Sequence, residues 1–448
     1  MPSNAHNMTS GSIPRHLLRY SIPAIMGDLF QVTYNTVDSV IVGQFAGAGA
    51  LAAVGVASPL MSVAMFFIIG MGIGASVLMS EFYGAGDMPR LRRQFATTLA
   101  MGAGFSVLIA LALFALTGPL LRLCHTPEAI FPDTARYLPI VALGMVVTSL
   151  YNILAAASRS IGDTLTPLIC LVAGSLVNVG LDLLFVARFT WGVAGAAWAT
   201  VISQALASAL CAWLLRRNEP MLFAGQGDFV PDRALFGRTL RFSAPSAMQQ
   251  AGVYVGKLLV QSAVNPLGVG AIAAFNAVNR IDDYALIPER DIANGETVLV
   301  AQNRGAGKAD RMQRGFFAAM ALEIAYGLIV SVAVFALAEP LMRLFVDTGE
   351  TEVIRLGTRY LRLMGLFYIL PGITNGLQGY MRALGKLKLT MVVTYAQMFT
   401  RAACTFLLIG AMGLDAVPLA CAAGWVMMTV WEVVLMVKWH RDGRLFRV

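Results

Sequence analysis

The sequence predicts an all-α integral membrane protein with twelve transmembrane helices, arranged as two pseudo-symmetric six-helix lobes that form a parallel repeat. Three observations predict this fold. Hydrophobic residues make up 57% of the 448 residues and charged residues only 13%, whereas soluble domains carry about 25% charged residues. Apolar windows of the length needed for a membrane crossing, about 20 residues, recur along the chain. Short motifs of the first half return in the second half at a nearly constant displacement.

Twelve apolar windows follow one another and define the expected order of helices. They are centred near residues 32, 66, 106, 146, 176, 204, 251, 285, 326, 368, 399 and 427. The eighth window is the most polar of the set. The predicted organisation is a tail over 1–19, an N-lobe over 20–215, a linker over 216–240, a C-lobe over 241–438 and a second tail over 439–448.

Three pairs of short motifs reveal the internal repeat. RYSIP at 19–23 returns as RFSAP at 241–245, displaced by 222 residues, and PLLRL at 119 returns as PLMRL at 340, displaced by 221. ARYL at 135 returns as TRYL at 358, displaced by 223. Because six is an even number of helices, both halves enter the membrane from the same side and form parallel repeats. Two equivalent bundles can rock about a central cleft and expose it to alternate sides.

The net charge of +8 is explained by topology. Basic residues concentrate in the loops on the N-terminal side of the membrane, and the positive-inside rule then predicts a multi-pass protein of the cell inner membrane with both termini cytoplasmic. Nucleic acid is therefore not an expected partner. Gly70, Gly72 and Gly74 are expected to allow a close approach between helices.

Two aspartates interrupt apolar stretches of the N-lobe. Asp38 lies in NTVDSVIVG and shares one helix face with Asn35, while Asp182 follows Asn178 by four residues, one turn of the fifth helix. A charged carboxylate at mid-membrane costs about 2.5–3.5 kcal/mol, so it normally faces a cavity or a partner. Burial disfavours the charged form of a carboxyl group, and a second carboxyl nearby adds to the effect. Such a pair can therefore bind and release a proton.

The repeat distinguishes this role from a purely structural one. The alternative is that each aspartate only hydrogen-bonds a neighbouring helix. Asp38 corresponds to Val260 and Asp182 to Thr405 in the second half, so the scaffold folds there without the acids.

The eighth window carries an acidic stripe. Asp282, Glu289 and Glu296 are spaced seven residues apart on a helix that we expect to kink near Pro288. Facing lipid would be costly, so the stripe is expected to line the central cavity, as substrate contacts or as a second ion site. Arg290 would pair with an acid on another helix, and Lys257 would reach Glu289. Gln250 completes this candidate set. The alternative is an ion-pair network that only holds the C-lobe together.

Four stretches resemble the multidrug and toxic compound extrusion (MATE) transporters, most of all their bacterial DNA-damage-inducible branch. They are PAIMGDLFQVTYNTVDSVIVGQFAGAGALAAVG, ASRSIGDT, LVNVGLDLLFV followed by WGVAGAAWATVISQ, and QNRGAG with Lys308 and Arg311. The resemblance implies a secondary antiporter that exports amphiphilic, cationic organic compounds. It places the coupling ion at Asp38, Asn178 and Asp182, with Thr200 and Asn35 nearby.

Protons are the expected coupling ion, with sodium as the alternative. Another branch of the family carries acids in the seventh and tenth helices, where this chain has only amides and a lysine: Gln249, Gln250, Lys257, Gln261, Asn375 and Gln378. The expected partners are a small amphiphilic substrate and membrane lipid, with the chain a monomer and no cofactor.

Three other functions compete with drug efflux. A lipid-linked oligosaccharide flippase would favour extra helices and a cationic cavity, and Lys257, Arg290 and Arg401 keep that alternative open. A dedicated metabolite exporter would have much the same sequence. A membrane-embedded enzyme is disfavoured, because the predicted spans hold no histidine, no metal-ligand spacing and no nucleophile–base pair. We therefore predict neither a catalytic residue nor a metal site.

Overall fold

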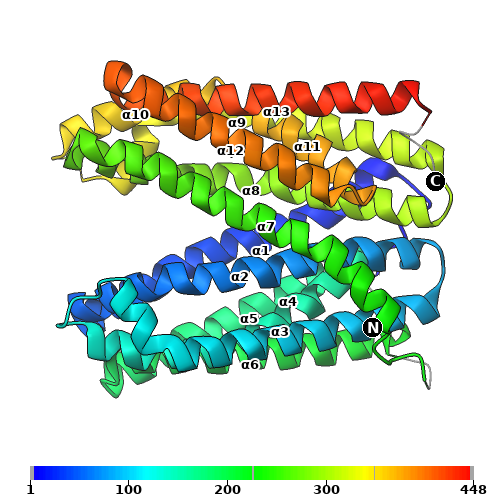
Figure 1. Cartoon of the computed structure of the whole chain (residues 1–448), viewed down its shortest axis with the longest axis horizontal. Coiled ribbons are helices and arrows are strands. Elements are labelled where there is room, and N and C mark those ends of the chain that lie inside the picture. Colours follow the sequence, from blue (N-terminus) through cyan, green and yellow to red (C-terminus); the bar gives the residue numbers. More distant parts are fainter. Residues whose placement is uncertain (1–4, 224–226, 348, 444–448) are drawn as a thin grey trace. The chain divides into compact units, whose positions relative to one another are not determined.

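The computed structural model describes residues 5–223, 227–347 and 349–443, and its regular elements there are all helical. This confirms the predicted all-α architecture (Figure 1). The helices are α1 Ile13–Ile41, α2 Gly47–Gly84, α3 Met88–Leu123, α4 Phe131–Ser160, α5 Leu165–Asp182, α6 Gly192–Asn218, α7 Arg233–Val264, α8 Val269–Gly305, α9 Ala309–Phe345, α10 Thr351–Gly365, α11 Ile369–Ala383, α12 Leu387–Met412 and α13 Ala416–Arg441.

The tenth predicted span is made of two helices. α10 ends at Gly365 and α11 begins at Ile369, with Tyr368 buried in the turn between them. Pro371 has no backbone N–H to donate to the carbonyl of Phe367, so a continuous helix would lose a hydrogen bond there. With α10 and α11 counted as one span, the described helices fill the twelve predicted windows.

Seven helical stretches of the described residues are long and apolar enough to cross a membrane. α1, α7 and α8 fall outside this set because polar side chains interrupt their apolar sequences. α8 nevertheless runs without interruption from Val269 to Gly305, with Pro288 inside it. The less apolar helices include those that carry Asp38 and the acidic stripe.

The chain divides into two compact units. Unit 1 contains Met1–Asn7 and Ile22–Ala247, and unit 2 contains Met8–Ser21 and Met248–Val448. The helices also extend past the predicted boundaries, since α1 begins at Ile13, α6 continues to Asn218 and α7 begins at Arg233. Each half therefore gives the first part of its first helix to the unit formed by the other half.

The repeated RYSIP and RFSAP motifs lie at this exchange. Ser21 of α1 donates its hydroxyl to the backbone carbonyl of Asp291 on α8 at 3.3 Å. Its repeat equivalent, Ser243 of α7, donates to the backbone carbonyl of Met71 on α2 at 3.2 Å. The same kind of residue thus makes the same kind of contact in both units.

Glycines make these two helix crossings possible. A methyl group on Gly70 would lie 2.3 Å from Cα of Ala247, and one on Gly74 would lie 2.6 Å from the backbone nitrogen of Ser243. At the equivalent place in unit 2, a methyl group on Gly295 would lie 2.9 Å from the ring of Tyr20. The close helix approach predicted for Gly70 and Gly74 is confirmed.

The segment before α1 is held by the turn between α8 and α9. The backbone N–H of Met8 donates to Oε1 of Gln302 at 2.9 Å, and the carbonyl of Met8 accepts from Nη2 of Arg311 at 2.9 Å. Lys308 donates Nζ to the carbonyl of Thr9 at 2.8 Å. The QNRGAG turn with Lys308 and Arg311 therefore binds backbone groups of the N-terminal segment.

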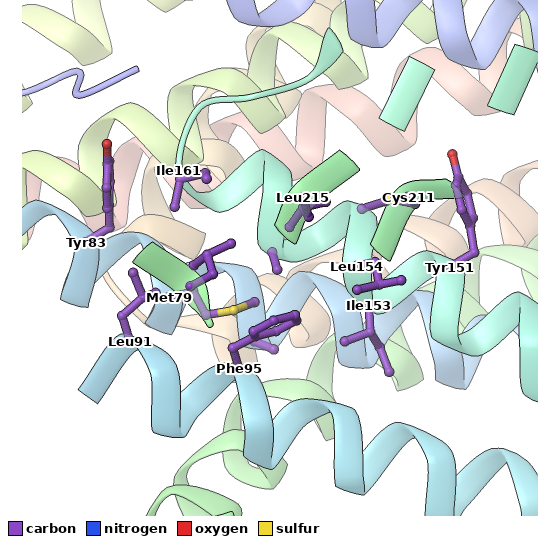
Figure 2. Packing of buried hydrophobic residues seen from close by; sticks show 14 of the residues in the cluster. Met79, Tyr83, Leu91, Phe95, Tyr151, Ile153, Leu154, Ile161, Cys211 and Leu215 are labelled. Atoms are coloured by element: carbon purple, nitrogen blue, oxygen red, sulfur yellow. The ribbon is translucent and has the colours of Figure 1, made fainter. Parts of the chain in front are cut away.

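Each unit has its own apolar core. In unit 1, side chains from α2, α3, α4 and α6 meet around Met79, Phe95, Leu154 and Leu215 (Figure 2). In unit 2 the largest cluster gathers side chains of α8 to α10 and α13 around Tyr360. These cores fix the positions of the polar side chains that interrupt them.

Candidate functional site

The two N-lobe aspartates meet in unit 1. Asp38 lies near the end of α1 and Asp182 is the last residue of α5, and their carboxyl groups share a side-chain hydrogen bond. Asp182 is fully buried, whereas Asp38 is half-buried. A carboxylate can only accept a hydrogen bond, so a bond between two carboxyl groups requires a proton on one of them.

Asn178 connects this pair to α6. In the orientation that satisfies both ends of its amide, the side-chain nitrogen donates to Oδ2 of Asp182 at 3.0 Å and the oxygen accepts from the backbone N–H of Thr200 at 3.2 Å. The hydroxyl of Thr200 instead donates to the carbonyl of Ala196 at 3.0 Å, within α6. Thr200 therefore contributes its backbone to the site.

Asn35 lies outside the hydrogen-bonded group. Its side chain is exposed, and in the described part of the chain no hydrogen bond links it to Asp38 or Asp182. Tyr34 of α1 and Tyr137 of α4, by contrast, lie within electrostatic range of both carboxyl groups. Sequence reasoning missed these tyrosines, although Tyr137 belongs to the repeated ARYL motif.

Both aspartates are followed by π-helical turns. α1 continues into the π-helix Val42–Ala46, and α5 continues into the π-helix Leu183–Arg188. Val42 and Val186 of these turns pack in one apolar cluster beside the site. π-turns occur mostly as single turns and frequently at functional sites. They have no simple sequence signature, and the apolar residues that form them read as ordinary helix.

Asp282 lies in a C-lobe counterpart of this arrangement. It accepts a hydrogen bond from the hydroxyl of Tyr368 and lies within electrostatic range of Arg401 and Tyr360. Arg401 stands 223 residues after Asn178, and Tyr360 stands 223 residues after Tyr137. The repeat thus places a cation in the C-lobe where the N-lobe has an amide.

The other two acids of the predicted stripe are fully buried in unit 2. Glu289 and Glu296 are 0% exposed, and neither carboxyl group has a hydrogen-bond partner among the described residues. α11 leaves room for them with glycines: a methyl group would lie 3.5 Å from Oε1 of Glu289 at Gly372, and 2.8 Å from Oε2 of Glu296 at Gly379.

Two further buried acids were missed by sequence reasoning. Glu323 of α9 is 0% exposed and lies within electrostatic range of both Glu289 and Glu296. Glu432 of α13 is also 0% exposed, and its Oε1 accepts from Nε2 of Gln378 at 3.1 Å. Each is the only acid of a long apolar segment, and the windows were still read as plain membrane spans.

An amide network rather than Gln250 connects α7 to these groups. Gln249 donates Nε2 to Oε1 of Gln378 at 2.8 Å and to the hydroxyl of Thr394 at 2.8 Å. Gln250, the predicted member, is only half-buried. Adjacent residues point about 100° apart on a helix, which puts Gln249 on the face that packs against α11 and α12.

The two predicted cations of the stripe occupy other positions. Lys257 forms an ion pair with Oδ1 of Asp283 at 3.2 Å, not with Glu289, so that prediction is wrong. Both partners of this pair are about half exposed, with side-chain exposures of 51% and 46%. Arg290 is exposed on α8, next to the buried Glu289.

Comparison with known proteins agrees with the fold. The sequence profile of the MatE family matches residues 23–184 and 245–407, and the two segments begin 222 residues apart, as RYSIP and RFSAP do. A Bacillus subtilis (strain 168) protein named "Probable multidrug resistance protein YpnP" is 27% identical over 389 residues, which cover 87% of this chain and 86% of that protein. The "FAD transporter" of Shewanella oneidensis is 25% identical over 350 residues, covering 76% of each.

A solved structure shares the same architecture. It is described as the outward-facing conformation of a multidrug resistance MATE family transporter of the MOP superfamily. It superimposes with a TM-score of 0.91 at 20% sequence identity and covers 100% of both chains.

Proposed function

The chain belongs to the MATE family, and from this premise we propose that it expels amphiphilic, cationic organic compounds across the cell inner membrane in exchange for protons. Its named relatives include multidrug resistance proteins. The observation that carries the proton part of the proposal is the hydrogen-bonded pair of Asp38 and Asp182.

Electrostatics explains how this pair would couple the two fluxes. With one shared proton the pair carries a single negative charge. Without it, two carboxylates in contact repel each other strongly in a poorly solvated site. The pair is then relieved either by taking up a proton or by an organic cation nearby. Proton and substrate would therefore compete for one charge state, which is the requirement for exchange.

The repeat supports alternating access as the means of transport. Two equivalent lobes can move relative to each other and expose the substrate to one side at a time. In this proposal both termini are cytoplasmic, and the proton returns inward as the drug leaves.

The direct test varies the two ions separately. Purified full-length chain in liposomes should move a fluorescent lipophilic cation when a pH gradient is imposed in sodium-free buffer. A sodium gradient at equal pH should drive little transport. The opposite result would replace the proton with sodium as the coupling ion. FAD should be included among the substrates tested, because one relative bears the name FAD transporter.

Glu289, with Asp282, is the second part of the proposal. The buried carboxyl group of Glu289 has no hydrogen-bond partner in the described residues, so it is available to an arriving cation or proton. We expect Glu289→Gln to reduce export of cations by about tenfold, which corresponds to about 1.4 kcal/mol of lost attraction. Export of a neutral amphiphile should fall much less.

Export assays in membrane vesicles at matched protein levels would measure this effect. Asp283→Asn is the matched control, since Asp283 is an exposed acid on the same helix that already pairs with Lys257. Equal losses for cationic and neutral substrates, or loss of the protein from the membrane, would support the structural role of the stripe instead.

A further inference from the structure

A cavity of about 650 Å³ lies within unit 2, between the end of α9 and the start of α10. Four arginines line it: Arg343 of α9, and Arg355, Arg359 and Arg362 of α10. Apolar side chains complete the wall, among them Phe335 and Leu366. The cavity thus offers a strongly basic surface beside a hydrophobic one.

The arginines exceed the acids that neutralise them. Arg343 pairs with Glu339 at 2.7 Å, Arg355 with Glu352 at 2.7 Å, and Arg359 with Asp415 at 2.5 Å. Arg362 is exposed and has no acidic partner within ion-pair distance in the described parts of the chain. One positive charge therefore remains uncompensated at the cavity.

The position of the cavity along the helices suits a membrane interface. α9 contains 37 residues and is therefore about 55 Å long at 1.5 Å per residue, well beyond the hydrocarbon core of about 30 Å. Its Arg343 end then lies among the lipid headgroups, while Phe335 lies about 12 Å deeper, at the level of the acyl chains. The charged and apolar walls follow the two ends of a phospholipid.

The arginine stripe follows helical geometry. Arg355, Arg359 and Arg362 are spaced by four and three residues, so they lie on one face of α10. That face is exposed, whereas Ile354, Tyr360 and Leu361 pack into the core. An unpaired arginine on an exposed face of a membrane helix is costly unless it reaches a counter-charge.

The repeat shows that the fold does not require these arginines. Arg343 has the N-lobe equivalent Arg122, 221 residues earlier. At a displacement of 223, however, Arg355 corresponds to Pro132 and Arg362 to Pro139. The N-lobe forms the same helices without the stripe.

We propose that this cavity binds the phosphate headgroup of an anionic phospholipid such as phosphatidylglycerol. Guanidinium groups donate pairs of hydrogen bonds to phosphate oxygens, and several arginines can share one phosphate. The single negative charge of a phosphodiester matches the single uncompensated charge of Arg362, and an acyl chain lies against Phe335 and Leu366. This site is separate from the residues of the proposed transport function.

Native mass spectrometry of the full-length chain in detergent would test the proposal, with phosphatidylglycerol, phosphatidylcholine and inorganic phosphate as separate probes. Wild-type protein should bind phosphatidylglycerol about tenfold more tightly than phosphatidylcholine. Arg362→Gln should remove most of that preference, and Arg122→Gln, the exposed equivalent in the N-lobe, should retain it. Thermal unfolding without lipid should be the same for both variants and the wild type.

Three outcomes would overturn the proposal. They are equal affinity of the wild type for both lipids, an equal loss of preference in Arg122→Gln, and displacement of the lipid by inorganic phosphate at a similar concentration. The last would identify a site for a free anion instead. If Arg362→Gln proves unstable, Arg355→Gln takes its place, because Arg355 is exposed on the same face.

Discussion

Replacing Asp38 with asparagine is expected to abolish proton-driven efflux while the protein is still made and inserted. The amide has nearly the same shape as the carboxyl group and can still hydrogen-bond Asp182, but it cannot take up or release a proton. Asp182→Asn should have a similar effect, because the two groups share one hydrogen bond. Asn178→Ala should cost less, since Asn178 only orients Asp182.

Transport driven by a pH gradient in liposomes would measure the loss. Glu128→Gln provides the control: Glu128 is an exposed acid of the N-lobe, away from α1 and α5. Substrate binding should be assayed on the same preparations, since a coupling role predicts that Asp38→Asn still binds drug without responding to pH. Full transport by Asp38→Asn would refute the role proposed for the pair.

A single methyl group at Gly70 is expected to destabilise the protein strongly. The added carbon would lie 2.3 Å from both the Cα and the backbone nitrogen of Ala247, and backbone atoms cannot turn aside as a flexible side chain can. Overpacking of this kind costs about 1–3 kcal/mol, so Gly70→Ala should lower the midpoint of thermal unfolding in detergent.

Gly104→Ala is the matched substitution for comparison. Gly104 lies on the exposed face of α3, and a methyl group there meets nothing within 4 Å. Alanine favours a helix over glycine by about 1 kcal/mol, so this variant should be as stable as the wild type or slightly more so. The crossing of α2 and α7 would need another explanation if both variants unfolded at the same temperature.

Most of the fold could be predicted because two strong signals agree. Long apolar windows give the helices, and the displacement of about 222 residues gives the two halves. Asp38 and Asp182 could be predicted as a pair because a carboxyl group in an apolar helix needs a partner, and the repeat removed a structural reason for them.

The rest depends on contacts that a linear pattern does not contain. The π-turns after both aspartates arise from how α1 and α5 pack, and apolar residues fit a π-turn and an α-helix equally well. Glu323 and Glu432 stood alone in apolar windows, so nothing in their own segments marked them. Lys257 was assigned to Glu289 by proximity in sequence, but its long, exposed side chain reaches Asp283, which lies nearer the surface.

The exchanged helix starts make this chain a fused form of a domain-swapped dimer. Met8–Ser21 belong to unit 2, and the start of α7 up to Ala247 belongs to unit 1. A polypeptide that begins at Met248 would leave Gln302, Lys308 and Arg311 without the backbone groups that they bind, and Gly295 without Tyr20. Neither half can then fold to completion alone, whereas a six-helix ancestor could have done so by lending its first turns to a second copy. Fragment complementation with a break placed between α6 and α7 would need both fragments to assemble in the same membrane.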